Sequence, residues 1–204
     1  MSISNRLANH FALAAVATAA VAATSNAAIM YSGVLNIVVP ASFDGVYMNV
    51  ETGSYASSAP FPDGWDVNPY GTSTTAVSLY ASTGGGYMRN PGAGTSTGRT
   101  NLAAGTAIGA ASFFYASSTA TIGTLVGQWS ANSSGIFGFK FLAADGLTHY
   151  GWMRLSIGAN AATRTIVDYG FESTAGAAIA AGAPAPGAIA LLGLAGLATR
   201  RRRA

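Results

Sequence analysis

The sequence predicts an all-β protein, an antiparallel β-sandwich of jelly-roll type spanning residues 28–173. Along several stretches of this region, apolar residues alternate with polar ones, which places the apolar side chains on one face of a strand. Between these stretches lie clusters of Gly, Pro, Ser, Thr, Asn and Asp, the residues typical of turns. The apolar spacing typical of helices is missing here. Many short strands separated by turns favour a sandwich.

Four stretches show the alternation most clearly, at residues 46–51, 136–141, 152–157 and 166–171. The residues expected to share a face are Val46, Met48 and Val50; Phe137, Phe139 and Phe141; Met153, Leu155 and Ile157; and Val167, Tyr169 and Phe171. Further strands are expected near 29–39, 76–81, 86–89, 112–116 and 124–129. The Ala- and Gly-rich segment 174–183 is expected to be a linker.

Residues 1–27 have the features of a secretory signal peptide. Arg6 supplies the positive start, and residues 11–23 form an apolar run. Ser25-Asn26-Ala27 places small residues where a signal peptidase cuts, which predicts cleavage after Ala27, with Ala28 as the second choice. An uncleaved N-terminal anchor is the less favoured alternative, because the run is short and rich in alanine.

The C-terminal end, residues 184–204, combines a proline motif, an apolar run without charge and a basic cluster. The motif is Pro184-Ala185-Pro186, the run extends to Thr199, and the cluster consists of Arg200, Arg201, Arg202 and Arg203. As a helix, the 16 residues of 184–199 would extend roughly 24 Å, against about 30 Å of bilayer hydrocarbon. Snorkelling arginine stems and a thinned bilayer would cover the difference, so we expect a short transmembrane helix.

The four arginines are expected to remain in the cytoplasm as a stop signal, because basic residues next to a span resist crossing the bilayer. The alternative for this end is an apolar tail with a solubilising basic end.

Composition excludes several classes of function. Residues 28–183 hold five basic and seven acidic residues, a net charge of −2, so no footprint for nucleic acid remains. The chain has no cysteine, which excludes disulfides, thiol nucleophiles and thiolate metal sites. We expect no cofactor and no enzymatic activity.

Two patterns that could indicate hydrolysis are weak. Gly94-Thr95-Ser96-Thr97-Gly98 matches G-x-S-x-G, but its flanks have loop composition where a hydrolase has a buried strand and a helix. His149 is the only histidine after residue 27 and could join Asp168 or Asp145 in a triad, yet no credible nucleophile accompanies it. A strand-edge hydrogen-bonding role is the better interpretation of His149.

Two further sets of residues suggest binding. Asp63, Asp66 and Asn68 offer hard oxygen ligands for Ca²⁺, although Asx turns explain the cluster better. Aromatic residues could form a platform that stacks against sugars, or they could fill the core. Trp65 and Trp152 are the leading candidates for ligand stacking, and the full set is Trp65, Tyr70, Tyr80, Tyr87, Trp129 and Trp152.

The C-terminal segment resembles the PEP-CTERM sorting signal of exported bacterial proteins, with Ala185 standing where the family has glutamate. Residues 29–183 also resemble the β-sandwich domain that commonly precedes this signal. The pieces that carry this second resemblance are Trp65-Asp66-Val67-Asn68, residues 102–109, Gly138-Phe139-Lys140-Phe141, His149-Tyr150-Gly151-Trp152 and residues 166–172.

The resemblance implies signal peptidase and exosortase as processing partners, with cutting near Pro184-Ala185-Pro186. It implies a chain that is exported, held at the inner membrane with a periplasmic domain, and then delivered to the cell surface or extracellular matrix. The function expected is that of a non-catalytic surface or matrix protein. The alternative is a lectin-like module that binds carbohydrate, such as exopolysaccharide.

Overall fold

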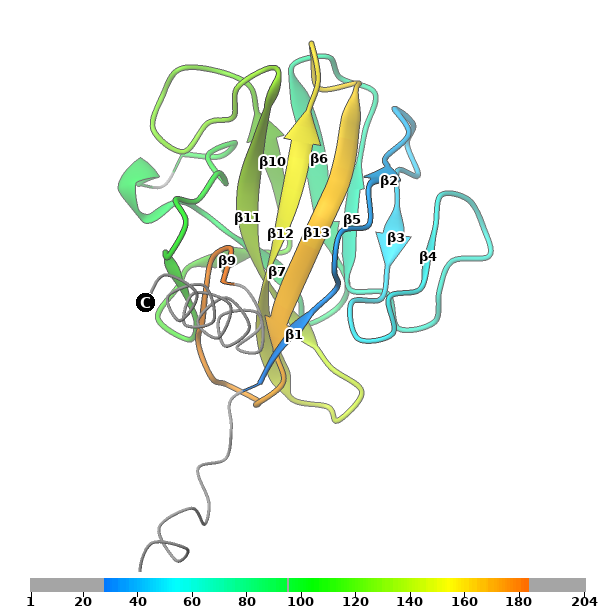
Figure 1. Cartoon of the computed structure of the whole chain (residues 1–204), viewed down its shortest axis with the longest axis vertical. Helices are drawn as coiled ribbons and strands as arrows, with labels where there is room; N and C mark the ends of the chain where they lie inside the picture. Colours follow the sequence, from blue (N-terminus) through cyan, green and yellow to red (C-terminus); the bar gives the residue numbers. More distant parts are fainter. Residues whose placement is uncertain (1–27, 95, 184–204) are drawn as a thin grey trace, which may run out of the picture.

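The computed structural model describes residues 28–94 and 96–183, which form an almost entirely antiparallel β-structure (Figure 1). Within these residues the single helical element is a 3-10 turn, η1 (Pro91–Ala93). No helix in this part of the chain is long and apolar enough to cross a bilayer.

The predicted sorting features lie outside the described residues. At the N-terminal end these are the signal peptide and its cleavage position, Ala27. At the C-terminal end they are the motif Pro184-Ala185-Pro186, the expected transmembrane helix, and the expected stop signal formed by Arg200, Arg201, Arg202 and Arg203. All of them therefore stay predictions from the sequence.

The larger sheet has seven strands, and its centre consists of the three longest strands of the described chain. Its order is β1 (Ile29–Tyr31), β13 (Arg164–Glu172), β12 (Thr148–Ile157), β11 (Ser133–Leu142), β7 (Gly86–Met88) and β9 (Phe114–Tyr115), with β2 (Ile37–Val38) also paired to β13. β11 and β12 pair without a break over ten residues.

The smaller sheet has five strands and lies behind β11–β13 in Figure 1. Its order is β10 (Ser117–Thr121), β6 (Ala76–Ala81), β5 (Val67–Tyr70), β3 (Tyr47–Met48) and β4 (Tyr55–Ala56). A third, two-stranded ribbon joins β14 (Ile179–Ala180) to β8 (Ala107–Ile108).

The main core lies between the two larger sheets, and the alternation in the sequence accounts for it. Phe137, Phe139 and Phe141 of β11 are fully buried. In the same cluster, the smaller sheet contributes Met48, Val67, Val77 and Leu79, and β12 contributes Met153, Leu155 and Ile157. The predicted apolar faces of 46–51, 136–141 and 152–157 are therefore confirmed.

One predicted face is wrong. Ile166, not Val167, packs in the core with Tyr169 and Phe171. The cause is a register shift in the β12–β13 pairing, where Arg154 lies opposite Asp168 but Leu155 lies opposite Ile166. Such a bulge adds one residue on one strand and reverses the alternation beyond it.

The predictions at weaker strands are mixed. Residues 29–39 contain two short strands rather than one, and 124–129 form a turn closed by the hydrogen bond from the Gln128 amide to the Leu125 carbonyl, 3.0 Å. The sequence does not predict the strand Ser117–Thr121, because Ala120 is its only apolar residue.

The outer face of the larger sheet is also covered. Trp152 is 1% exposed and packs with Leu102, Ile108, Ile136 and Ile179 in a second cluster. The supposed linker 174–183 therefore belongs to the packed domain, because β14 closes this cluster. The apolar residues Ile179 and Ala181 are the reason: both are buried.

Two polar ties join the larger and smaller sheets. The Tyr87 hydroxyl of β7 donates to the Tyr80 carbonyl (2.8 Å) and accepts from the Asn68 amide (3.0 Å). The buried guanidinium of Arg164, on β13, donates to the carbonyls of Pro40 and Gly71. The first tie links β7 directly to β5 and β6, and the second links β13 to Gly71, the residue that follows β5, and to Pro40 in the loop before β3.

Candidate functional site

The outer face of the smaller sheet carries four aromatic rings in contact, which we call the aromatic row: Phe61, Tyr47, Trp65 and Tyr80. Phe61 stacks on Tyr47 with ring centres 3.8 Å apart, and Trp65 meets Tyr47 edge-on at 4.9 Å. Tyr80 lies 6.0 Å from Trp65. The edge-on contact between Trp65 and Tyr47 is one of the favourable arrangements for aromatic pairs.

Strand alternation directs the row outward. Met48, next to Tyr47 on β3, is buried in the main core, so Tyr47 faces the opposite side. On β6, Leu79 and Ala81 are buried while Tyr80 is 46% exposed. Phe61 and Trp65 come from the loop before β5 and are half-buried.

Hydrogen bonds fix the loop that carries Phe61 and Trp65. The Asn49 side chain donates to the carbonyls of Asp63 (3.1 Å) and Gly64 (3.0 Å). Beyond Trp65, the Asp66 amide donates to the Met48 carbonyl at 2.8 Å. The rings are thus held on a pinned backbone, so a ligand that stacks on them would not have to order the loop first.

The polar surroundings of the row come from hydroxyls and one acid. Partial burial raises the pKa of the Tyr47 hydroxyl, and the negative charge of nearby Asp44 raises it further. The Asp44 carbonyl accepts a hydrogen bond of 2.7 Å from the Asn68 side chain. A set of aromatic faces flanked by neutral hydroxyls suits a neutral, hydroxyl-rich ligand with apolar faces.

Asp63, Asp66 and Asn68, the residues for which Ca²⁺ was the weaker interpretation, differ in burial. Asp66 and Asn68 are each 2% exposed, whereas Asp63 is exposed. Asp66 Oδ2 instead accepts from the Val50 amide at 2.9 Å. Residues 28–94 and 96–183 contain no group of three or more His, Asp or Glu side chains placed to share a metal ion.

His149 has a structural environment. Its Nδ1 lies 2.8 Å from the Glu172 carbonyl oxygen and its Nε2 lies 3.1 Å from Asp145 Oδ2. Burial lowers its pKa, but these two acceptors outweigh burial and raise the pKa overall. Both ring nitrogens are therefore engaged, and neither is directed at a serine.

The other hydrolase residues are also placed elsewhere. Asp168 accepts from Arg154 (2.8 Å) and from the Tyr31 hydroxyl (2.9 Å). Ser96 is exposed, and the preceding Gly94 follows the 3-10 turn η1 rather than a buried strand. The G-x-S-x-G segment therefore lacks the strand–turn–helix setting that a nucleophilic serine needs.

Of the two leading stacking candidates, only Trp65 is accessible to solvent, being half-buried. Trp152 cannot stack against a ligand because the second cluster buries it. Of the wider aromatic set, Tyr87 and Trp129 are fully buried, while Tyr80 belongs to the row. Sequence reasoning missed Tyr47 and Phe61. For Tyr47, its place between the core residues Val46 and Met48 was a usable signal.

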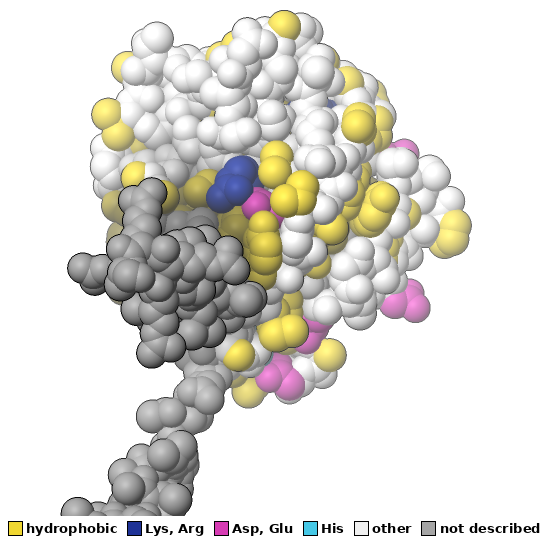
Figure 2. Space-filling model, viewed as in Figure 1, with side chains coloured by type: hydrophobic (Ala, Val, Ile, Leu, Met, Phe, Trp, Pro, Cys, Tyr) yellow, Lys and Arg dark blue, Asp and Glu magenta, His cyan; other side chains and the backbone are white. Residues whose placement is uncertain are grey.

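Comparisons with known proteins find no matching family model, no similar curated protein and no similar solved structure. The face seen in Figure 2 is weakly charged, with hydrophobic side chains spread across it and few basic or acidic ones.

Asp66, beneath the row, makes stability depend on pH. Burial is the main reason why the pKa of its carboxyl is raised to about 7. The hydrogen bond from the Val50 amide lowers this pKa, and the negative charge of nearby Glu51 raises it. The native state therefore binds the Asp66 proton more tightly than the unfolded state does. The resulting contribution to the free energy of unfolding is complete below about pH 4 and is lost as the pH rises to about 7. The loss has a slope of up to about 1.4 kcal/mol per pH unit. Asp66→Asn should remove this slope while keeping an acceptor for Val50.

Urea unfolding of wild type and Asp66→Asn at intervals from pH 4 to 7.5 measures the effect. Subtracting the two curves removes the titration of the other carboxyl groups. We expect the variant to gain relative stability as pH rises. A difference that is constant with pH would show that Asp66 titrates as an ordinary carboxyl.

Proposed function

We propose that the protein is a non-catalytic, exported surface or matrix protein whose domain is a β-sandwich of jelly-roll type. The observation that carries this proposal is the combination of a signal-peptide pattern ending at Ala27 with the C-terminal sequence from Pro184 to Arg203. The domain between them has antiparallel sheets packed over one core, as a sandwich requires. A jelly-roll is the form of sandwich that we infer.

In this proposal, signal peptidase and exosortase process the two ends. The apolar run up to Thr199 holds the chain in the inner membrane, and the four arginines after it keep the C-terminus cytoplasmic. The domain then lies in the periplasm. Cutting near Pro184-Ala185-Pro186 follows β14 closely, so it would release the packed domain intact to the cell surface or matrix.

Neutral replacement of the arginines tests the sorting role. Exchanging Arg200, Arg201, Arg202 and Arg203 together for Gln should leave the fold unchanged, because the packed domain is built from residues before 184, but should leave the chain mislocalised or unprocessed. Exchanging the same four for Lys keeps the charge and is the matched control. Cell fractionation and mass spectrometry of the C-terminus report the outcome. Equal anchoring and trimming of the Gln and Lys chains would contradict the proposal.

The second candidate function is binding of a carbohydrate such as exopolysaccharide. The observation that favours it is the outward-facing aromatic row on a rigid sheet, with hydroxyls beside it. Sugar rings present apolar C–H faces and polar edges, which match such a surface. The row is a face rather than a deep cavity, so an extended chain fits it better than a small sugar.

Removing Trp65 tests this candidate. Trp65 contacts both Tyr47 and Tyr80, so Trp65→Ala interrupts the row. We expect polysaccharide binding to weaken by about tenfold, which corresponds to roughly 1.4 kcal/mol. Tyr55→Ala is the matched control, because Tyr55 is 53% exposed on neighbouring β4 and is not part of the row. A glycan array followed by calorimetry measures both. If wild type binds glycan and both variants bind equally, the row is not the binding face.

A further inference from the structure

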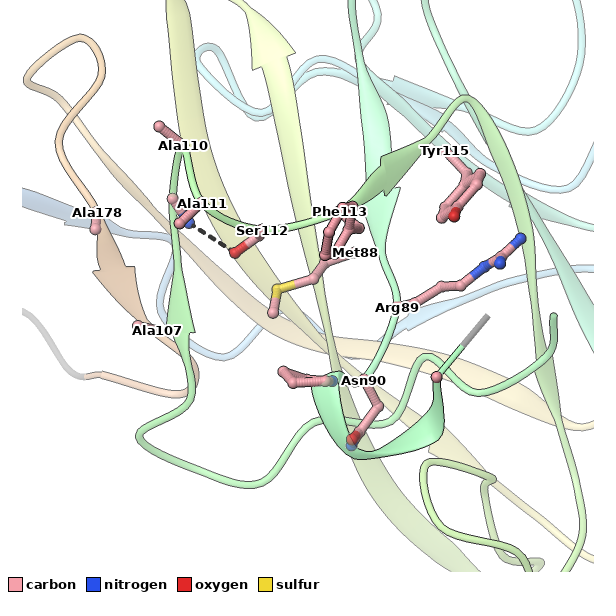
Figure 3. Close-up of a pocket in the computed structure, with 13 residues that line it drawn as sticks. Met88, Arg89, Asn90, Ala107, Ala110, Ala111, Ser112, Phe113, Tyr115 and Ala178 are labelled. Carbon is pink, nitrogen blue, oxygen red and sulfur yellow. Dashed lines mark hydrogen bonds between the residues drawn. The ribbon is translucent and has the colours of Figure 1, made fainter. Parts of the chain in front are cut away.

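A hollow of about 590 Å³ opens at the edge of the larger sheet, beside β7 and β9 (Figure 3). Its walls include Met88, Ala107, Ala111, Phe113 and Ala178. Figure 3 shows the Met88 side chain pointing toward the segment that carries Ala107 and Ala111. The loop forming that wall is closed by a hydrogen bond of 3.2 Å from the Gly109 amide to the Ser112 hydroxyl.

The walls are apolar although they face water. Phe113 is 78% exposed, and Ala107, Ala111 and Ala178 are exposed as well. Among the described residues that line the hollow, Arg89 carries the only charge, and its guanidinium lies 3.5 Å from the ring centre of Tyr115. An exposed apolar concavity of this kind marks an interaction site.

The described chain ends beside this hollow. Ala178 lines it, and β14 follows directly at Ile179–Ala180, paired with the strand that carries Ala107. The uncharged run 184–199 begins four residues after Ala180. As a helix, the eleven residues from Ala183 to Leu194 would span roughly 17 Å, which would give the leucines of the run the length to fold back toward a hollow that Ala178 already lines.

We propose that the hollow is the docking site for the chain's own C-terminal apolar segment, residues 187–198. In water, this segment would otherwise expose its leucines, and covalent attachment gives it a high effective concentration at the hollow. The run itself carries no charge, so the single charge of the lining, on Arg89, does not oppose its docking. Docking shelters the apolar run before it meets a membrane, and it does not depend on processing at Pro184-Ala185-Pro186.

The absence of native cysteine allows a clean cross-linking test on the chain from residue 28 to 204. Ala111→Cys with Leu194→Cys places one thiol in the hollow and one in the segment. Ala110→Cys with Leu194→Cys is a second pair, and both alanines are exposed, so the fold should tolerate either change. Under a mild oxidant in water, we expect both pairs to form an intramolecular disulfide.

The matched control is Phe43→Cys with Leu194→Cys. Phe43 is 82% exposed in the loop between β2 and β3. In Figure 1 these two strands lie on the other side of the molecule from β9. The pairs in the hollow should cross-link roughly tenfold faster than this control. Equal rates for hollow and control pairs would overturn the proposal. Cross-linked dimers in place of monomers would overturn it too, since the occupant would then be the segment of a second copy.

Discussion

The fold depends on two neighbouring sets of cross-strand partners at the centre of the larger sheet. In one set a glycine lies between two aromatic rings, and in the other a tryptophan lies between two glycines. On the core face, Gly151 of β12 lies between Phe139 of β11 and Phe171 of β13. One position along, on the outer face, Trp152 lies between Gly138 and Gly170. Two of these glycines make room for a ring: a Cβ on Gly151 would lie only 2.4 Å from the Phe139 ring, and one on Gly170 would lie 3.1 Å from the Trp152 ring. Sliding one strand by a residue would place ring beside ring and leave glycines unfilled, so these two sets of partners fix the register.

The correct register then positions the rest of the molecule. It directs Phe137, Phe139 and Phe141 into the main core, against which the smaller sheet packs. On the other face it directs Trp152 outward, where β8 and β14 cover it and end beside the apolar hollow. Two positions along from Trp152, Arg154 pairs with Asp168, immediately before the bulge that brings Ile166 to the core. The aromatic row lies on the far surface of the smaller sheet, so its rigidity derives from the same core.

Sequence reasoning succeeded where one face of a strand is apolar and the other polar. It predicted the buried faces around Phe139, Met153 and Met48 for that reason. It failed at Val167 because a bulge reverses alternation without changing the composition. The sequence also did not predict what covers Trp152, since Ile179 belongs to a segment whose Ala and Gly content is typical of a linker. At the candidate site, Trp65 was a candidate from the sequence, but the stacking of Phe61 on Tyr47 depends on a loop conformation that the Asn49 side chain holds through hydrogen bonds.

The most direct test of this dependence is a double-mutant cycle at Gly151 and Phe139. Gly151→Ala should cost about 1–3 kcal/mol of unfolding free energy, because the added methyl group meets the Phe139 ring. In a Phe139→Leu background the ring is gone, so the same change should cost clearly less. Urea unfolding of the four chains gives the coupling energy, which we expect to reach about 1 kcal/mol or more. Equal costs in both backgrounds would show that the glycine does not make room for the ring and that the register has another origin.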